Sequence, residues 1–220
     1  MTATELYEGT LAELLDQLGG IPAHRVLLKP APGTATEEDV LKARSRPWKR
    51  ICELIDGTLV EKDMSTNEGF LSGVILHFIW VYLDVNDLGL VFPGDAHLRL
   101  RPGLIRVPDV SFVPWNRIPN EELPDDPIAS LAPELAVEVI TSNNTKREIE
   151  LKLADYFAVG CKLAWIIDPE TKTAKVYNSA KRFKELDETG TLEGGKVLPG
   201  FKLALADIFA ATKRRKKKPS

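Results

Sequence analysis

Two short runs decide how this chain is interpreted: VPDV at 107–110 and AVEVI at 136–140. The first places Asp109 in a predicted strand, and the second places Glu138 in the next predicted strand. Both acids stand where a buried strand normally carries an apolar side chain. A helix predicted over 146–159 follows them and carries Lys152. The question is whether these groups form a hydrolytic site.

Glu138 lies in a nearly continuous apolar run, which is typical of a central strand buried on both faces. Side chains alternate along a strand, so Glu138 shares a face with Ala136 and Ile140 and is the single charge on it. A buried carboxylate is costly unless it is paired or bound to a cation. The alternative is a glutamate at a strand end that reaches solvent or a lysine.

Asp109 follows Pro108, and proline cannot donate to a strand ladder. We therefore expect a strand edge or a bulge here, and bulges often redirect a side chain toward an active site. The alternative is an edge aspartate in a turn.

Lys152 lies one residue away from the apolar stripe of its predicted helix, beside Ile149 and Tyr156. Its aliphatic stem can follow the buried edge and direct the ammonium toward Glu138. Lys146, near the opposite border of the stripe, is a rival. For either lysine the alternative is a solvated helix face.

The combination matters because hydrolysis of a phosphodiester requires a hard divalent cation held by carboxylates. A neighbouring lysine can orient the attacking water or stabilise the developing charge.

The chain of 220 residues is 44% hydrophobic and 28% charged, which is compatible with a packed core. Its net charge of −3 includes six cations within 213–218; without them, 23 basic and 32 acidic residues remain, a balance of −9. A basic tail can bind nucleic-acid phosphates, or it can be a disordered solubilising end. With no apolar run of membrane-spanning length, no signal peptide and two cysteines, we expect a cytoplasmic protein.

We expect an N-terminal helical and Pro-rich appendage over 1–47, a main domain over 48–210 and a basic tail over 211–220. In the main domain, 52–61 reads as a hairpin with an Asp-Gly turn. A helix over 67–85 is apolar nearly all round and is expected to be substantially buried, with His77 as a core histidine. A further strand is expected over 104–113. The pattern predicts an α/β fold in which helices flank a central mixed sheet.

The chain resembles the Uma-type "putative restriction endonuclease" family of the PD-(D/E)XK nuclease superfamily. The resemblance covers about residues 50–209. Its motifs are ELIDG at 53–57, Pro108-Asp109, VEVI at 137–140, KLADY at 152–156 and WIIDP at 165–169.

The resemblance implies a restriction-endonuclease-like core that uses Mg²⁺ (or Mn²⁺), with Asp109 and Glu138 as metal ligands. The superfamily pattern places a lysine two residues after the second acid, where this chain has Ile140. The resemblance implies that the lysine has moved to Lys152. Glu53 matches an early acidic position of the family and joins the catalytic set. Glu68 is a weaker auxiliary candidate, and its place near a helix start equally suits a contact with the helix dipole.

The sequence thus favours a metal-dependent endonuclease acting on DNA, with the backbone carbonyl of Val139 as a third metal ligand. Because cutting a duplex takes two cuts, a homodimer is a natural expectation. The alternative function is a catalytically degraded nuclease fold that binds nucleic acid or protein. A third reading is a structural domain whose acids only pair with basic residues.

Overall fold

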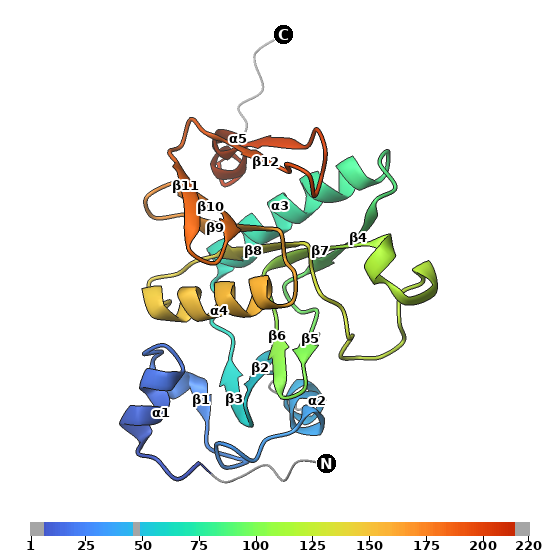
Figure 1. Cartoon of the computed structure of the whole chain (residues 1–220). Helices are drawn as coiled ribbons and strands as arrows, with labels where there is room; N and C mark the ends of the chain where they lie inside the picture. Colours follow the sequence, from blue (N-terminus) through green and yellow to red (C-terminus); the bar gives the residue numbers. More distant parts are fainter. Residues whose placement is uncertain (1–6, 46–48, 214–220) are drawn as a thin grey trace.

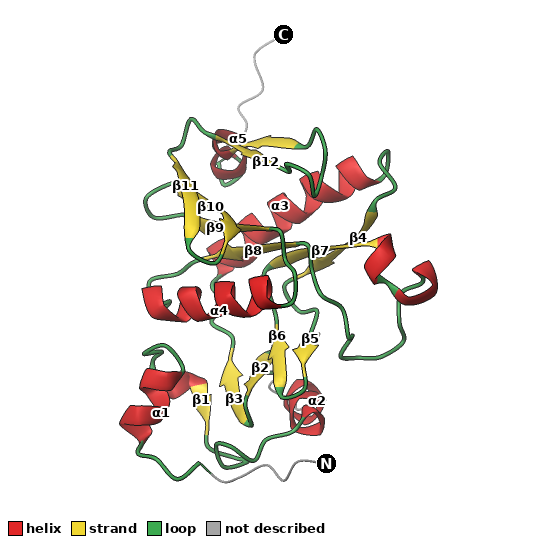
Figure 2. Cartoon of the chain, in the orientation of Figure 1, coloured by secondary structure: helices red, strands yellow, loops and turns green. Residues whose placement is uncertain are grey.

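The computed structural model describes residues 7–45 and 49–213. It contains two larger sheets, which lie one above the other in the view of Figures 1 and 2 with helix α4 (Lys146–Ala158) between them. The six-stranded sheet has the strand order β11-β10-β9-β8-β7-β4, and the five-stranded sheet has the order β1-β3-β2-β6-β5. A small third sheet pairs β12 with β13.

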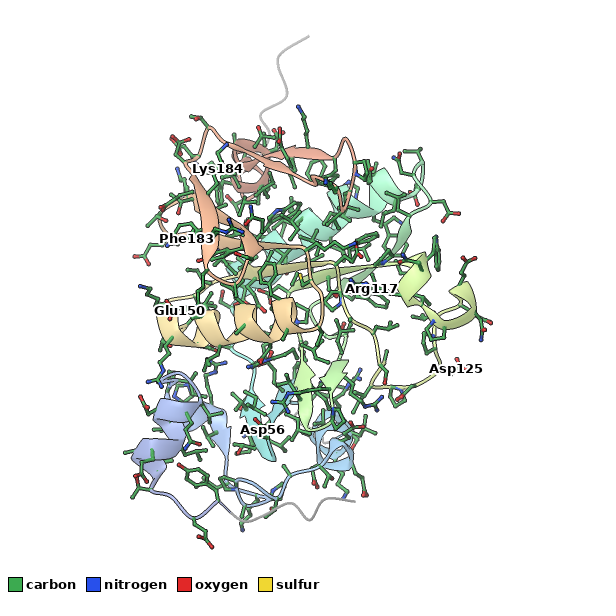
Figure 3. The ribbon with its side chains drawn as sticks, viewed as in Figure 1. Asp56, Arg117, Asp125, Glu150, Phe183 and Lys184 are labelled. Carbon is green, nitrogen blue, oxygen red and sulfur yellow. The ribbon has the colours of Figure 1, made fainter. Side chains whose placement is uncertain are left out.

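The larger sheet is mixed, because β8 and β9 run parallel whereas its other neighbouring strands are antiparallel. β11, whose Phe183 and Lys184 are labelled in Figure 3, forms one edge, and β4 forms the other. The strands are β4 (Gly89–Pro93), β7 (Val110–Pro114), β8 (Leu135–Val139), β9 (Leu163–Asp168), β10 (Thr173–Ser179) and β11 (Arg182–Leu186).

Two helices cover opposite faces of this sheet. Helix α3 (Thr66–Leu83) packs Leu71, Ile75 and Ile79 onto the face that carries Leu135, Val137 and Val139. Helix α4 (Lys146–Ala158) packs on the other face. The apolar side chains Leu135, Val137 and Val139 of β8 therefore face α3, and Glu138 faces α4.

The smaller sheet is entirely antiparallel. Helix α1 (Leu11–Gln17) covers one side of it, and helix α2 (Glu37–Ser45) covers the other. Its strands are β1 (Val26–Leu27), β2 (Cys52–Ile55), β3 (Thr58–Glu61), β5 (Leu98–Arg101) and β6 (Leu104–Arg106).

The C-terminal part of the described chain forms a cap over α3. Leu198, Phe201, Leu205 and Ile208 join the core that α3 shares with the larger sheet. The elements of this cap are β12 (Thr191–Glu193), β13 (Lys202–Ala204) and α5 (Leu205–Ala210).

The predicted α/β class with a central mixed sheet and flanking helices is confirmed, and so is the 52–61 hairpin. Asp56 and Gly57 adopt φ values of 44° and 77°, as such a two-residue turn requires. The division of the chain at residues 47 and 210 stays a prediction. Residues 1–6, 46–48 and most of the predicted tail, 214–220, lie outside the described residues.

The expectation of one strand over 104–113 is wrong. β6 belongs to the smaller sheet and β7 to the larger one, so the chain crosses between the sheets at Val107, Pro108 and Asp109. Pro108 interrupts the ladder, as proline does.

The expectation of a substantially buried helix over 67–85 is wrong for one side of it. Phe70 is 48% exposed, Val81 50% and Trp80 55%, and His77 lies at the surface rather than in the core. The side toward the sheet is buried as expected.

Among the described residues, no helix is both long and apolar enough to cross a membrane.

Candidate active site

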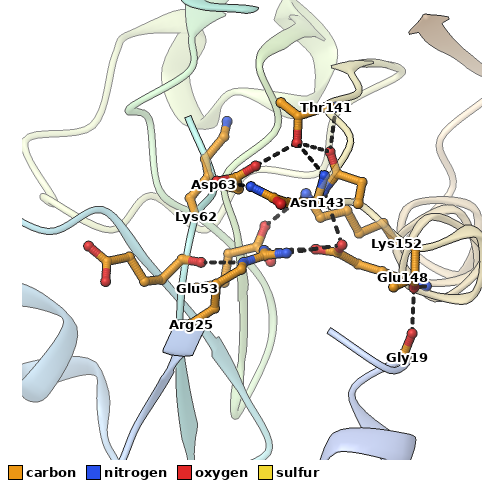
Figure 4. A network of polar contacts seen from close by, with 12 residues as sticks. Gly19, Arg25, Glu53, Lys62, Asp63, Thr141, Asn143, Glu148 and Lys152 are labelled. Carbon is orange, nitrogen blue, oxygen red and sulfur yellow. Dashed lines mark hydrogen bonds and ion pairs between the residues drawn. The ribbon is translucent and has the colours of Figure 1, made fainter. Parts of the chain in front are cut away.

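The junction between the two sheets brings the predicted site residues together. Glu53 comes from β2 of the smaller sheet, Asp109 from the crossing segment, Glu138 from β8 and Lys152 from α4. All four are buried, with exposed fractions of 2–4%. Figure 4 shows Glu53 and Lys152 within the polar network that surrounds this junction.

Asp109 and Glu138 lie on neighbouring strands. Val110 pairs with Val137 in the antiparallel ladder, so Asp109, one residue earlier, stands opposite Glu138. The backbone N–H of Asp109 donates to Val137 O at 3.0 Å, and Val139 N–H donates to Asp109 Oδ2 at 2.6 Å. The backbone of β8 thus fixes the direction of the Asp109 carboxylate.

Lys152 reaches from α4 to Glu138. Its Nζ lies 2.9 Å from Glu138 Oε2 and 3.7 Å from Glu53 Oε1. The rival lysine, Lys146, is exposed and pairs with Glu150 on the same helix. Burial alone would lower the pKa of Lys152, but Glu138 and Glu53 outweigh it and raise that pKa, so the ammonium stays charged.

Tyr156 completes the environment of Glu138. Its hydroxyl donates to Glu138 Oε1 at 2.5 Å. Burial and the neighbouring Asp109 raise the pKa of Glu138, although Lys152 acts in the opposite direction. Both oxygens of this carboxylate therefore have a donor from α4, four residues apart on one helix face.

Glu53 is held in its ionised form by two cations. Arg106 donates to Glu53 Oε2 at 2.7 Å, and Val107 N–H donates to Oε1 at 3.1 Å. Burial alone would raise the pKa of Glu53, but Lys152 and Arg106 lower it to about 2. Arg106 also contacts Asp155 of α4 at 2.6 Å. Glu53 and Arg106 therefore connect α4 to the smaller sheet through Lys152 and Asp155.

Lys62 is a functional candidate that sequence reasoning missed. Its Nζ lies 2.5 Å from Asp109 Oδ1 and donates to Val107 O at 2.8 Å, and the residue is 7% exposed. One signal could have found it: Lys62 continues the alternation of the buried Thr58 and Val60 beyond the end of β3. The other missed residues are Arg106 and the hydroxyl of Tyr156.

Glu68 stands on the other side of Asp109, at the start of α3. Ser65 caps this helix, and Ser65 and Glu68 exchange side-chain to backbone hydrogen bonds of 3.1 and 3.3 Å. Burial and the adjacent Asp109 carboxylate raise the pKa of Glu68 to about 8. At neutral pH this carboxyl group is therefore mostly protonated.

The buried groups at the junction are three cations and four carboxyl groups: Glu53, Lys62, Glu68, Arg106, Asp109, Glu138 and Lys152. Burial contributes most to the raised pKa of Glu68 and Asp109 contributes next, whereas Lys62 acts in the opposite direction.

A second network holds α4 in place from the N-terminal side. Arg25 donates to both carboxylate oxygens of Glu148, at 2.8 and 3.1 Å, and Asn144 donates to the same carboxylate (Figure 4). Thr145 Oγ1 donates to Gly19 O at 2.5 Å. The start of α4 is therefore fixed, and with it the position of Lys152 two turns further along.

A cavity of about 330 Å³ borders the cluster beside Glu68. It lies where β8 and β9 end and α3 begins, and Ser65, Ile140 and Asp168 belong to its lining. Ligands in α/β folds commonly bind at the carboxyl ends of parallel strands. Of the acidic residues in the cluster, Glu68 belongs to the lining of this cavity.

In the part of the chain that the structure describes, no three His, Cys, Asp or Glu side chains are arranged to hold a metal ion. The chemistry of the donors nevertheless fits a hard cation. Asp109, Glu138 and Glu68 are neighbouring buried carboxyl groups, and proximity to Asp109 raises the pKa of both glutamates. Such a set of oxygen donors gains from a positive charge.

The comparison with curated proteins returned no match. Among solved structures, the chain is similar to one described as a "putative nuclease belonging to DUF820" from Anabaena variabilis. The TM-score is 0.64 at 20% identity, over 73% of this chain and 90% of that one. At this identity the likeness shows a shared fold.

The model of the Uma2 family, described as "Putative restriction endonuclease", matches residues 38–206. That range includes Glu53, Lys62, Asp109, Glu138 and Lys152, and it is more than half of the chain. The chain therefore belongs to the Uma2 family of restriction-endonuclease-like proteins.

Proposed function

We propose that this protein is a divalent-metal-dependent endonuclease that hydrolyses phosphodiester bonds in DNA. One observation carries the proposal: two acids from neighbouring strands and a lysine from a helix meet in one buried cluster beside a cavity. A structural role alone would not require three neighbouring buried carboxyl groups, in which burial and Asp109 raise the pKa of Glu68 and Glu138, because such crowding costs stability. The family description agrees with this chemistry.

In the proposed site, Asp109 and Glu138 hold Mg²⁺ or Mn²⁺, and Glu68 is an auxiliary oxygen donor. The ion would neutralise phosphate charge and lower the pKa of a bound water. Lys152 favours the ionised form of Glu138 and would provide positive charge for the phosphorane-like transition state. Glu53 holds Lys152 and Arg106 in position.

Lys62 has a distinct place in this proposal. It pairs with the Asp109 oxygen that a metal ion would use, so the ion and the ammonium compete for Asp109. The same pairing favours the second candidate function, a degraded nuclease fold that binds nucleic acid without cutting it. In that case Lys62 permanently replaces the cation.

The test is cleavage of supercoiled plasmid with Mg²⁺ or Mn²⁺. The wild type is compared with Asp109→Asn, Glu138→Gln and Lys152→Met, which preserve side-chain size. We expect nicked and linear products from the wild type and a loss of about a hundredfold or more in each variant. Lys146→Met is the matched control, because Lys146 is exposed on the same helix, and it should cut like the wild type.

Linear duplex and single-stranded DNA are tested in parallel with the plasmid. Equal or absent cleavage by the wild type and all three variants on every DNA substrate would refute the proposal. Retained DNA binding in a gel-shift assay without cleavage would instead support the binding module.

A further inference from the structure

A second cavity adjoins the one beside Glu68. The two cavities share Asn67, in the first turn of α3, and Pro169, which follows β9. The second cavity has a volume of about 550 Å³ and is lined by residues of α3, of the turn after β9 and of α5, which belongs to the cap over α3 (Figure 1). We call it the α5 cavity. Because the two cavities adjoin, a strand whose phosphate lies at the first can place the next nucleotide in the second.

Part of the lining of the α5 cavity is apolar. It includes Leu71 of α3 and Phe209 of α5. It also includes Ala206 and Ala210, which lie one turn apart on α5 and whose small side chains leave space for a ligand. The ring of Phe209 is a surface against which a flat group can stack. A cavity of this size and lining suits a small ligand with an apolar face.

The remainder of the lining carries polar and positively charged groups. Lys172 and Lys213 belong to it, and Asn67 offers an amide donor and acceptor. Lys172 contacts Glu188 at 3.4 Å, and the two side chains are 50% and 61% exposed. Such an exposed ion pair contributes little to stability, so Lys172 can exchange Glu188 for a phosphate group.

A nucleotide combines the features that this lining would recognise. Its phosphate is anionic, its base has a flat apolar face, and the edge of the base carries hydrogen-bonding groups. In a duplex the faces are covered by stacking and the Watson–Crick edges are paired, so a base enters a cavity only when it is unpaired or flipped out. The α5 cavity therefore fits a nucleotide of a single strand better than one of a duplex.

On the basis of the proposed nuclease function, we propose that the α5 cavity binds the base of an unpaired nucleotide next to the scissile phosphate, which makes single-stranded DNA the preferred substrate. Two observations carry the proposal. The α5 cavity continues the one beside Glu68 through Asn67 and Pro169, and it combines an apolar lining with two lysines.

The first experiment measures binding of a fluorescent single-stranded DNA oligonucleotide to the full-length protein by anisotropy, with EDTA present to prevent cleavage. Ala210→Glu places a carboxylate in the cavity. Ala211→Glu is the matched control, because it adds the same charge at the same end of α5 but Ala211 lines a different cavity. We expect the dissociation constant to rise more than about tenfold in Ala210→Glu and less than about threefold in Ala211→Glu. Ala206→Glu, one turn earlier, should act like Ala210→Glu.

The second experiment tests the phosphate contact of Lys172 through its salt dependence. Each phosphate of a single strand that a protein neutralises contributes about 0.7 to the slope of log affinity against log salt concentration. In Lys172→Gln the slope should become shallower by about this amount. Lys196→Gln is the control, because Lys196 is exposed and lies outside the cavity, and its slope should equal that of the wild type.

The third experiment compares cleavage of single-stranded and duplex DNA of the same sequence with Mn²⁺. The wild type should cut the single strand faster, and Ala210→Glu should lose this preference while Ala211→Glu keeps it. Thermal unfolding of both variants shows that each is folded.

Three results would overturn the role of the α5 cavity: a wild type that does not bind the single strand, equal binding by Ala210→Glu and Ala211→Glu, or a wild type that cuts the duplex as fast as the single strand. The last of these leaves the nuclease function intact. Loss of binding in Ala210→Glu alone, without cleavage of any DNA by the wild type, would support the cavity as a base-binding site and reject the nuclease function.

Discussion

Lys62 and Asp109 form a buried ion pair within the candidate site. The Lys62 ammonium contacts Asp109 Oδ1 at 2.5 Å and also two backbone carbonyls, those of Val107 and Gly94. These contacts hold a positive charge where the proposed metal would sit. The ion pair stabilises the metal-free protein, and the proposed metal ion would have to displace the ammonium.

Replacing Lys62 with methionine should therefore have opposite effects on stability and on metal binding. Without the ammonium, the buried Asp109 carboxylate is unpaired, and the free energy of unfolding should fall by about 3–5 kcal/mol without metal. Mn²⁺ affinity, measured by calorimetry, should rise. Lys146→Met is the control for both measurements. Unchanged Mn²⁺ affinity in Lys62→Met would show that the ammonium and the metal do not share a position.

Glu53 provides a prediction about pH. Its ordinary pKa of 4.5 is lowered to about 2 in the folded state. A carboxylate with a lowered pKa stabilises the fold above pH 4.5, and that contribution is lost as the pH falls from 4.5 toward 2. At neutral pH it amounts to about 3 kcal/mol.

The change that tests this is Glu53→Gln, followed by urea denaturation at several pH values. The variant should be less stable than the wild type at pH 7, because Arg106 and Lys152 lose their counter-ion. The difference between the two proteins should shrink as the pH falls below 4.5. A difference that stays constant down to the acid limit would mean that Glu53 is not ionised in the folded protein.

At the scale of helices and strands, local sequence patterns predicted those elements that interactions between neighbouring residues determine. The Asp-Gly turn identified the β2–β3 hairpin. Pro108 indicated an interruption of the strand, but the crossing between sheets at Val107–Asp109 could not be predicted, because only the tertiary structure decides which sheet each part joins.

For the candidate site too, the sequence could not predict contacts that only the tertiary structure brings about. Glu138 was recognisable because a charge in an apolar strand is conspicuous, and Asp109 because it follows Pro108 between two apolar runs. Lys62 was not, since it follows the hairpin by one residue and its partner is 47 positions away in the chain. The exposed side of α3 was misjudged because apolarity all round a helix predicts burial on every side, whereas Phe70, Trp80 and Val81 are about half exposed.

The capping of α3 leads to a prediction at this scale. Ser65→Ala removes the side chain that accepts the Glu68 N–H, and the free energy of unfolding should fall by about 1 kcal/mol. Because the cap also fixes the first turn of α3, the position of Glu68 beside Asp109 should loosen. Ser72→Ala is the matched control, because Ser72 bonds only within the same helix, to Gly69 O. Equal stability of the two variants, measured by thermal unfolding, would contradict a role for the cap.

At the scale of the whole molecule, the candidate site is also the connection between the two sheets. Glu53 and Arg106 belong to the smaller sheet, Glu138 to the larger one, and α4 contacts both through Lys152 and Asp155. A ligand that binds Asp109 and Glu138 therefore joins elements that come from the two halves of the fold. Binding of such a ligand should therefore raise the free energy of unfolding of the whole domain.

Metal addition and removal should thus change the unfolding temperature of the whole protein. A ligand that binds only the folded state adds about 2.7 kcal/mol when its concentration is a hundred times its dissociation constant. We expect Mn²⁺ to raise the unfolding temperature of the wild type and EDTA to reverse the rise. Glu138→Gln, which keeps the shape of the side chain but not its charge, should show neither effect. Because this measurement needs no cleavage, a rise in the wild type without nuclease activity would identify a metal-binding but inactive site. The absence of any rise would leave Lys62 as the only cation that Asp109 accepts and would favour the binding module.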